Sequence, residues 1–198
     1  VLDVTPAREM PGVIMVVTAQ DLNDAGVSPL PCGLPVKNRD GSDMRKPPRP
    51  SLAEGTVRFR GEACALVVAE SHAQARDAAE AIILEVADLP AVTDAREALH
   101  PSAPCLHVEA PGNLALDWEF GPTDTVNAAF KGAHHVESLG LVSNRVVVNA
   151  MEPRAAVVQY DAASDRYTMH GPSQGAFGLR NGLAGAVMGI EKEKLRVL

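Results

Sequence analysis

The chain has 198 residues, of which 46% are hydrophobic and 22% are charged, and its formal net charge is -7 at pH 7. This composition is typical of globular proteins and excludes disorder of the whole chain, and the length allows one or two small domains. The negative charge argues against a nucleic acid or an anionic membrane as the main partner, because both attract concentrated Lys and Arg side chains.

The cysteines indicate a reduced compartment. Cys32, Cys64 and Cys105 are an odd number at wide spacing, with no Cys-x-x-Cys pair for zinc or an iron-sulfur cluster. No charged-then-apolar leader opens the chain, and no apolar run approaches the roughly 18 to 20 residues that cross a bilayer. We therefore expect a cytoplasmic protein without a membrane span.

The first elements are a strand, a short helix and a long loop. The apolar run from Val13 to Val17 predicts a strand, followed by a helical turn that Thr18 caps. Six prolines between Gly26 and Pro50 predict a loop, because proline lacks the backbone donor that helices and central strands need. The chain opens at Val1 without an obvious partner strand, so we expect an N-terminally truncated domain.

Regular structure is expected again from residue 56. Val57–Phe59 and Ala63–Ala69 predict two strands around Gly61, the second apolar enough to be central in a sheet. Ser71 and Gln74 have the spacing of a capping box, in which each side chain satisfies an open backbone N–H. The apolar face of the helix that follows consists of Ala75, Ala78, Ala79 and Ile82.

A domain boundary follows this mixed α/β unit. Residues 83–86 and 91–93 predict a further strand, bent at Leu89 and Pro90. Prolines and a glycine then cluster between Pro101 and Gly112, which indicates a linker. We therefore expect one domain over residues 1–109 and the beginning of a second over residues 110–198.

The second part predicts a helix and then a sheet. Residues 123–131 have a helical pattern, and the alternating, β-branched stretch from Ala133 to Tyr160 predicts a long antiparallel sheet. Residues 161–165 predict a hairpin turn, and Arg166–His170 the returning strand. The expected fold class is α/β of the α+β type.

Gln174 is the main candidate for a binding residue. It follows Gly171-Pro172-Ser173 after the returning strand, at the predicted start of a helix. A glutamine amide beside open helix N–H groups can donate a hydrogen bond to an anionic or oxo group without adding charge. In the alternative interpretation, Ser173 and Gln174 only cap the helix.

Four glycines follow at offsets of four, three and four, which places them on one face of a helix. They are Gly178, Gly182, Gly185 and Gly189. Because each glycine inside a helix costs about 1 kcal/mol against alanine, we expect something to approach this face closely. Either another element of the same protein or a cofactor would explain it.

Glu152 and Arg154 are two residues apart on a predicted strand and share a face, with Pro153 indicating an edge or a bulge. They are expected to pair with each other or with a neighbour such as Arg145. The alternative, a general acid-base role for Glu152, lacks a second carboxylate.

No residue of this chain is assigned as catalytic or as a metal ligand. The adjacent His134 and His135 point to opposite faces of a strand and cannot chelate one ion. The sequence contains no phosphate loop, nucleophile elbow or His-Glu-x-x-His helix.

The order of several short motifs resembles the xanthine dehydrogenase and aldehyde oxidase family over nearly the whole chain. The first half resembles its hammerhead domain, and the second half resembles the start of its molybdopterin-binding domain, especially in the carbon monoxide dehydrogenase-like branch. The first set is Pro11–Val13, Val57–Glu62, Ala65–Glu70, Gln74–Glu80 and Leu89–Val92. The second set is Asn144-Arg145, Asn149–Ala155, Tyr160-Asp161, Pro172–Gln174 and Leu195–Val197.

This resemblance implies a molybdenum hydroxylase large subunit. Such enzymes insert a water-derived oxygen into an aldehyde or N-heterocycle, or oxidise carbon monoxide. It implies a molybdenum-molybdopterin cofactor, with FAD and iron-sulfur clusters on other domains or subunits. It also implies that Gln174 hydrogen-bonds an oxygen ligand of the molybdenum. The expected partners are the remainder of the large subunit, the iron-sulfur and flavin subunits in an oligomer, and a small-molecule substrate.

The chain departs from the family pattern in ways that affect activity. Ser173 stands where relatives often have threonine, which keeps the hydroxyl group. The family's Phe-Gly-Gly segment, further pterin-binding loops and catalytic glutamate would lie beyond Leu198. We therefore expect the isolated chain to be inactive and to bind no cofactor. The alternative is a non-catalytic scaffold or subunit-interaction module with the same fold.

Overall fold

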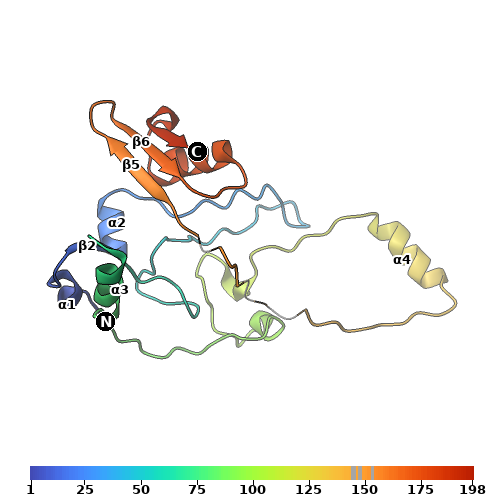
Figure 1. The fold of residues 1–198 in the computed structure, drawn as a ribbon. Helices are drawn as coiled ribbons and strands as arrows, with labels where there is room; N and C mark the ends of the chain where they lie inside the picture. Colours follow the sequence, from blue (N-terminus) through green and yellow to red (C-terminus); the bar gives the residue numbers. More distant parts are fainter. Residues whose placement is uncertain (144–145, 147–148, 153) are drawn as a thin grey trace.

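The computed structural model describes residues 1–198 except 144, 145, 147, 148 and 153. Its strands form three small sheets, and Figure 1 shows the last sheet above the first part of the chain. The strands are β1 (Leu2–Asp3), β2 (Val13–Thr18), β3 (Ala65–Ala69), β4 (Ile83–Leu84), β5 (Val157–Asp161), β6 (Arg166–His170) and β7 (Leu195–Val197). The α-helices are α1 (Thr5–Arg8), α2 (Ala19–Asp24), α3 (His72–Glu80), α4 (Thr123–Gly132) and α5 (Ala176–Asn181). The short helices are η1 (Glu97–Leu99), η2 (Pro111–Asn113), η3 (Gly182–Val187) and η4 (Lys192–Lys194).

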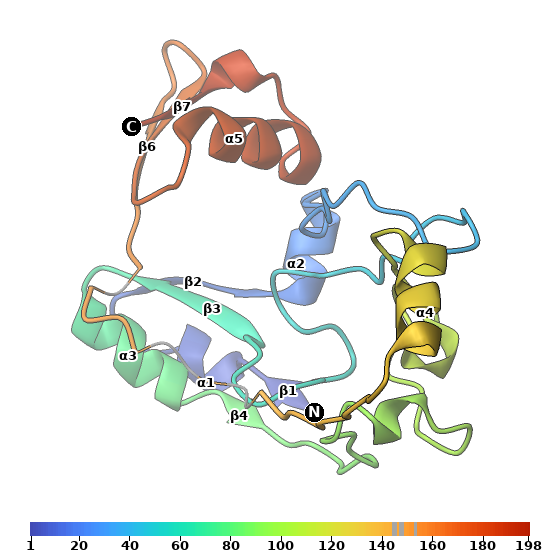
Figure 2. The ribbon, with the colours of Figure 1, turned by 90° about the vertical axis from the view of Figure 1, so that its right-hand side faces the viewer.

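The first part has a small core between one sheet and two helices. β2 and β3 pair antiparallel, with Val16 opposite Val67, and α1 and α3 pack beside them (Figure 2). Val4 and Val16 are buried, and Ala7 and Ala78 are completely inaccessible to solvent. The two alanines allow α1 and α3 to approach each other closely, because neither side chain extends beyond Cβ. This packing confirms the predicted mixed α/β class.

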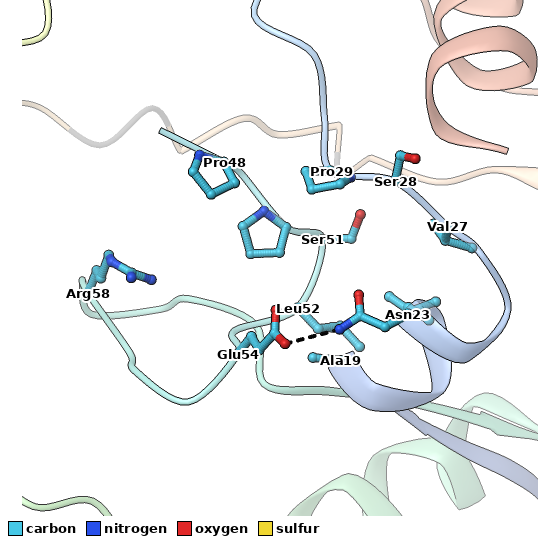
Figure 3. A pocket seen from close by; sticks show the side chains of 12 residues that line it. Ala19, Asn23, Val27, Ser28, Pro29, Pro48, Ser51, Leu52, Glu54 and Arg58 are labelled. Atoms are coloured by element: carbon cyan, nitrogen blue, oxygen red, sulfur yellow. Dashed lines mark hydrogen bonds between the residues drawn. The ribbon is translucent and has the colours of Figure 1, made fainter. Parts of the chain in front are cut away.

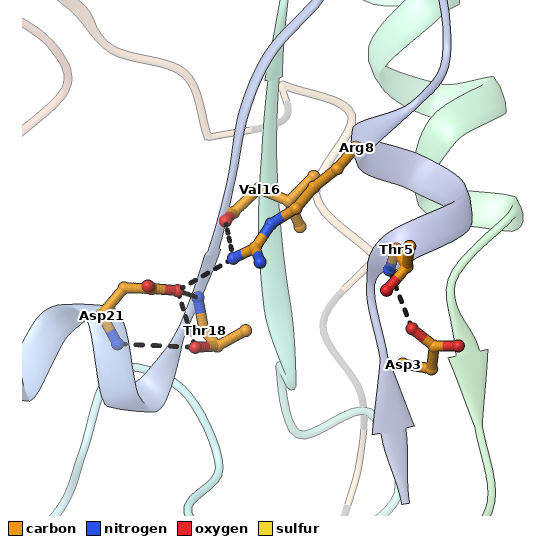
Figure 4. A network of polar contacts seen from close by, with 6 residues as sticks. All are labelled: Asp3, Thr5, Arg8, Val16, Thr18 and Asp21. Atoms are coloured by element: carbon orange, nitrogen blue, oxygen red, sulfur yellow. Dashed lines mark hydrogen bonds and ion pairs between the residues drawn. The ribbon is translucent and has the colours of Figure 1, made fainter.

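Thr18 caps α2 as the sequence predicts. Its hydroxyl accepts a hydrogen bond from the Asp21 N–H, and the Asp21 carboxylate accepts one from the Thr18 N–H at 2.7 Å. Figure 4 shows that Arg8 joins this capping box to the core. Its guanidinium donates to the Val16 carbonyl at 3.2 Å and lies 3.6 Å from the Asp21 carboxylate. One carboxylate therefore connects α1, β2 and α2.

These contacts predict that the stability contributed by Asp21 depends on pH. The Thr18 hydroxyl and N–H, with a further contribution from Arg8, lower the pKa of the Asp21 carboxyl in the folded chain. Stability from these contacts is thus fully present above the unfolded pKa of about 3.9, and it is lost as the pH falls through the lower folded value. In thermal unfolding, Asp21→Asn should lower Tm at neutral pH but much less in acid. Asp88→Asn, in an exposed loop, is the control; an equal Tm difference at both pH values would contradict the assignment.

The predicted capping box of α3 is half present. Ser71 accepts a hydrogen bond from the Gln74 N–H at 3.3 Å, but the Gln74 side chain does not return to the Ser71 N–H. Instead its carbonyl accepts from the Ser71 hydroxyl at 2.6 Å, and its amide donates to the Pro11 carbonyl at 3.4 Å. Gly12 leaves the necessary space, since a Cβ there would lie 2.0 Å from the Gln74 amide nitrogen, and its φ is +79°.

Three strand predictions in this part are wrong in whole or in part. Val57–Phe59 is not a strand, and the chain turns at Gly61, where φ is +87°. β3 pairs with β2 alone among the described residues, so it is not central. The predicted strand at residues 83–86 shrinks to the two residues of β4, and residues 91–93 are irregular. Alternating sequence does not form a strand when no neighbouring strand supplies the hydrogen bonds.

The second part confirms the predicted helix and hairpin. α4 spans Thr123–Gly132, and β5 and β6 pair antiparallel across a turn in which Asp165 adopts a φ of +49°. The Tyr160 hydroxyl stabilises this turn by donating to the Asp165 carboxylate at 2.8 Å. β7 then pairs parallel to β6 and completes a three-stranded sheet.

The prediction of a long sheet over residues 133–160 is wrong except for the strand β5. The described residues between α4 and β5 have no regular structure. All ten residues of α4 are exposed, and the helix lies on an extended excursion away from the three sheets (Figure 1). No helix of the described chain is long and apolar enough to cross a membrane.

Candidate cofactor-contact site

Gln174 lies in the connection between β6 and α5. The helix begins only at Ala176, its N-cap is Gly175, and no side chain caps it. The interpretation in which Ser173 and Gln174 cap the helix is therefore wrong. Both side chains are exposed, so the Gln174 amide is available to a group outside the helix.

An open groove lies directly beside Gln174. Its walls come from two distant segments: the β6–α5 connection with the helix that follows, and the beginning of the proline-rich loop (residues 26–50). Apart from Ser173 and Gln174, its side chains are apolar or absent. The lining residues are Leu30, Pro31, Pro172, Ser173, Gln174, Gly175, Gly178, Leu179, Gly182, Leu183 and Val187. A backbone hydrogen bond of 2.9 Å from the Ser28 N–H to the Val187 carbonyl fixes the loop against the helix.

The predicted glycine stripe is only partly present. Gly178 and Gly182 line the groove, and a Cβ on either would meet open space rather than a neighbour. Gly185 is not in the groove wall, because η3 is a π-helix and its wider turn moves offset-three residues off the shared face. Gly189 lies beyond the helix with a φ of +65°. No described residue approaches these glycines closely, so the expected close neighbour does not lie in the part of the chain that the structure describes.

This arrangement fits a one-sided contact with a polar group. The first N–H groups of α5 have no side-chain cap, and the neutral Gln174 amide supplies a further donor at the same place. Among the described residues, no three His, Cys, Asp or Glu side chains are grouped to hold a metal ion. The donors present fit contact with a cofactor's oxygen.

The other predicted residues do not join this site. Glu152 and Arg154 are exposed, outside any strand, and form no ion pair with each other. Pro153, Asn144 and Arg145 lie outside the described residues, so the pairing with Arg145 is not tested.

The two histidines are also separate from the groove. His134 and His135 are exposed and lie in irregular chain rather than on a strand. His135 Nε2 lies 2.6 Å from a Glu137 carboxylate oxygen, a local pair at the surface.

Arg180 is a polar residue of α5 that sequence reasoning missed. Its guanidinium lies 5.2 Å from the centre of the Phe177 ring, a cation-π distance. Its Nε atom is buried and has no hydrogen-bond partner among the described residues. The three-residue spacing of Phe177 and Arg180 on a predicted helix was the available signal.

A second, smaller cavity of about 160 Å³ lies between α2 and the proline-rich loop (Figure 3). Inside it the Asn23 amide donates to the Glu54 carboxylate at 3.1 Å, and Arg58 stands at its edge. Asn23 and Glu54 thus bind each other across the cavity, whereas the Arg58 guanidinium donates to the Leu106 carbonyl at 3.2 Å. The Asn23–Glu54 bond ties the segment after the proline-rich loop to α2, and the cavity is not assigned a ligand.

Comparison with known proteins decides the family. Residues 1–90 match the family model "Aldehyde oxidase and xanthine dehydrogenase, a/b hammerhead domain", and residues 106–198 match "Molybdopterin cofactor-binding domain". The chain belongs to the aldehyde oxidase and xanthine dehydrogenase family. This family consists of molybdopterin-dependent oxidoreductases, so the resemblance drawn from the short motifs is confirmed.

Individual proteins that are similar to the chain support the same family assignment. The nicotine 6-hydroxylase large subunit of Paenarthrobacter nicotinovorans is 34% identical over 83% of the chain and 19% of its own length. The carbon monoxide dehydrogenase large chain of Afipia carboxidovorans is 24% identical over 100% of the chain and 24% of its own length. A crystal structure of Cu,Mo-CO dehydrogenase superimposes with a TM-score of 0.83 at 25% identity, over 100% of the chain and 25% of that protein. The chain thus spans about a fifth to a quarter of these relatives.

Proposed function

We propose that the chain acts as part of a molybdenum hydroxylase large subunit and supplies one side of its cofactor site. The two consecutive family matches, in the order hammerhead then molybdopterin-binding, carry this proposal. Within it, residues 1–109 form the hammerhead domain and residues 110–198 the first part of the cofactor-binding domain. The bound cofactor would supply hydroxylation of an aldehyde or N-heterocycle with water-derived oxygen, or oxidation of carbon monoxide.

Gln174 is the residue of this chain proposed to contact the cofactor. Its amide N–H would donate to a cofactor oxygen, and the open N–H groups at the start of α5 would favour negative charge beside it. A neutral donor stabilises such an oxygen without adding a counter-charge. The apolar walls of the groove, among them Leu30 and Leu183, would limit the water that competes for this bond.

The solvent-accessible surface supports a role inside a larger protein. A compact monomer of 20.8 kDa exposes about 8,900 Å². This chain exposes 15682 Å². The accessible surface beyond that of a compact monomer indicates that much of this chain is suited to contact with further protein. The small core of the first part agrees with this, because few of its side chains are buried within the chain.

The excursion around α4 contributes much of this apolar surface. Phe120, Leu139 and Leu141 are each more than four-fifths exposed, and Phe130 on α4 is 59% exposed. Side chains of this kind form the buried centre of protein interfaces. We propose that the remainder of the large subunit covers them, and that iron-sulfur and flavin subunits complete the oligomer.

The free cysteines support a reducing compartment, for which we propose the cytoplasm. The three cysteines form no disulfide with one another, and two of them, Cys32 and Cys105, are exposed. Exposed thiols persist where glutathione and thioredoxin keep them reduced.

The competing function is a non-catalytic scaffold or subunit-interaction module with the same fold. Reading the genomic sequence downstream of the codon for Leu198 separates the two. The enzyme-subunit proposal predicts an open reading frame that continues into a Phe-Gly-Gly motif. A stop codon directly after Leu198 would contradict it and leave the scaffold.

A further inference from the structure

A hairpin inside the proline-rich loop reaches the second family-matched region. Residues 37–45 form this hairpin: Lys37 and Asp43 make a β-bridge, and Gly41 turns the chain with a φ of +82°. The Asn38 N–H donates to the Ser42 carbonyl at 2.9 Å. The loop that the sequence predicts as a mere connection therefore has a defined local structure.

The hairpin binds residues 111–119 through the backbone. The Arg39 N–H donates to the Asp117 carbonyl at 2.8 Å, and the Arg45 N–H donates to the Ala115 carbonyl at 2.9 Å. In return the Asp117 N–H donates to the Asn38 side-chain carbonyl at 2.8 Å. These bonds fix the register between two segments whose bonded residues lie 70 to 79 positions apart in the sequence.

Two arginine side chains reinforce the same contact. The Arg39 guanidinium donates to the carboxylates of Asp117 at 2.9 Å and Glu119 at 3.2 Å. The Arg45 guanidinium donates to the carbonyls of Pro111 and Leu114, each at 3.1 Å. A planar guanidinium holds two acceptors at once, which a lysine ammonium does with less geometric definition.

We propose that this contact, the clasp, is the element that docks the hammerhead region on the cofactor-binding region, with Arg39 as its central residue. Residues 37–45 lie in the first family match and residues 111–119 in the second. The same loop also touches the helix after Gln174 through Ser28, so it contacts the second region both near its start and, through the clasp, in its middle. While the clasp is closed, the two regions unfold together.

The single tryptophan of the chain reports on the clasp. Trp118 stands between Asp117 and Glu119 and stacks on Phe120 with ring centroids 5.9 Å apart. Its fluorescence therefore follows residues 111–119, whereas far-UV circular dichroism follows the helices and strands of the whole chain.

The test is urea unfolding of the 198-residue chain, followed by both signals, with acrylamide quenching of Trp118 in the native state. In the unmodified chain the two transitions should coincide. Arg39→Ala should shift the tryptophan transition to lower urea than the dichroism transition and raise the quenching constant. The double variant Arg39→Ala/Asp117→Ala should shift the tryptophan transition little further than Arg39→Ala alone, because Asp117 has already lost the guanidinium it binds.

Arg49→Ala is the matched control, since Arg49 lies on the same loop but its side chain makes no hydrogen bond or ion pair with residues 111–119, all of which the structure describes. It should leave the transitions coincident. Raising sodium chloride to about 1 M, where the screening length is about 3 Å, should increase quenching in the unmodified chain and not in Arg39→Ala. Coincident transitions in Arg39→Ala, an equal response from Arg49→Ala, or no tryptophan transition in the unmodified chain would each overturn the clasp. The test does not depend on molybdenum, so a negative result would refute the clasp without bearing on the proposed function.

Discussion

Replacing Gln174 by alanine in the complete large subunit is expected to lower kcat by about 10–100-fold, the range found when a residue supporting a metal centre is removed. The Gln174 side chain is exposed in a groove and supports no other described element, so the substitution should leave the fold intact. KM should change little, because the proposed hydrogen bond goes to the cofactor rather than to the substrate. Steady-state kinetics with a dye acceptor measures both parameters.

Two further variants make this result specific. Gln159→Ala removes another exposed glutamine, on β5 and outside the groove, and should leave kcat unchanged. Gln174→Glu preserves size but replaces the donor with a negative charge, so it should be at least as damaging as alanine. Activity in Gln174→Ala equal to that of the unmodified enzyme would remove Gln174 from the site.

The isolated 198-residue chain is expected to carry no stoichiometric molybdenum and to show no dye-linked dehydrogenase activity. Gln174 offers one neutral donor in an open groove, and one such bond contributes only about 0.5–1.5 kcal/mol net. Without ligands from elsewhere in the subunit, that contribution does not offset the entropy lost when a large cofactor is immobilised.

Mass spectrometry for metals, on chain purified from cells that make the cofactor, measures this directly. The complete large subunit, expressed in the same cells, is the positive control. One molybdenum per isolated chain would show that residues 1–198 hold a sufficient site, and it would contradict the proposed division of the site between this chain and other segments.

The elements predicted correctly are those that local sequence determines. Thr18 with Asp21 caps α2 within one turn, and the β5–β6 hairpin is set by its turn residues. The strands that were predicted wrongly are nonlocal failures. Residues 57–59 and the described part of 133–156 have strand-like sequence, yet they form no strand because no partner lies beside them.

The candidate site was predictable to the same extent. The position of Gln174 after a strand and before a helix follows from local pattern, and the structure reproduces it with a two-residue delay in the helix start. The opposite wall, formed by Leu30 and Pro31, was not predictable, since proline-rich sequence carries no periodicity that indicates where a loop will pack. The π-helical turn at η3 likewise breaks the regular helical spacing that the glycine stripe assumed.

The shared groove affects how this family can be recombined. Its lining is divided between residues 30–31 and residues 172–187, so neither family-matched region contains it alone. A chimaera that joins residues 106–198 of this chain to the hammerhead region of a relative would exchange Leu30 and Pro31 for foreign side chains. Transplanting the segment around Ser28 together with the cofactor-binding region would keep both walls of the groove. This short loop therefore has to be transferred with the cofactor-binding region if the site is to be preserved.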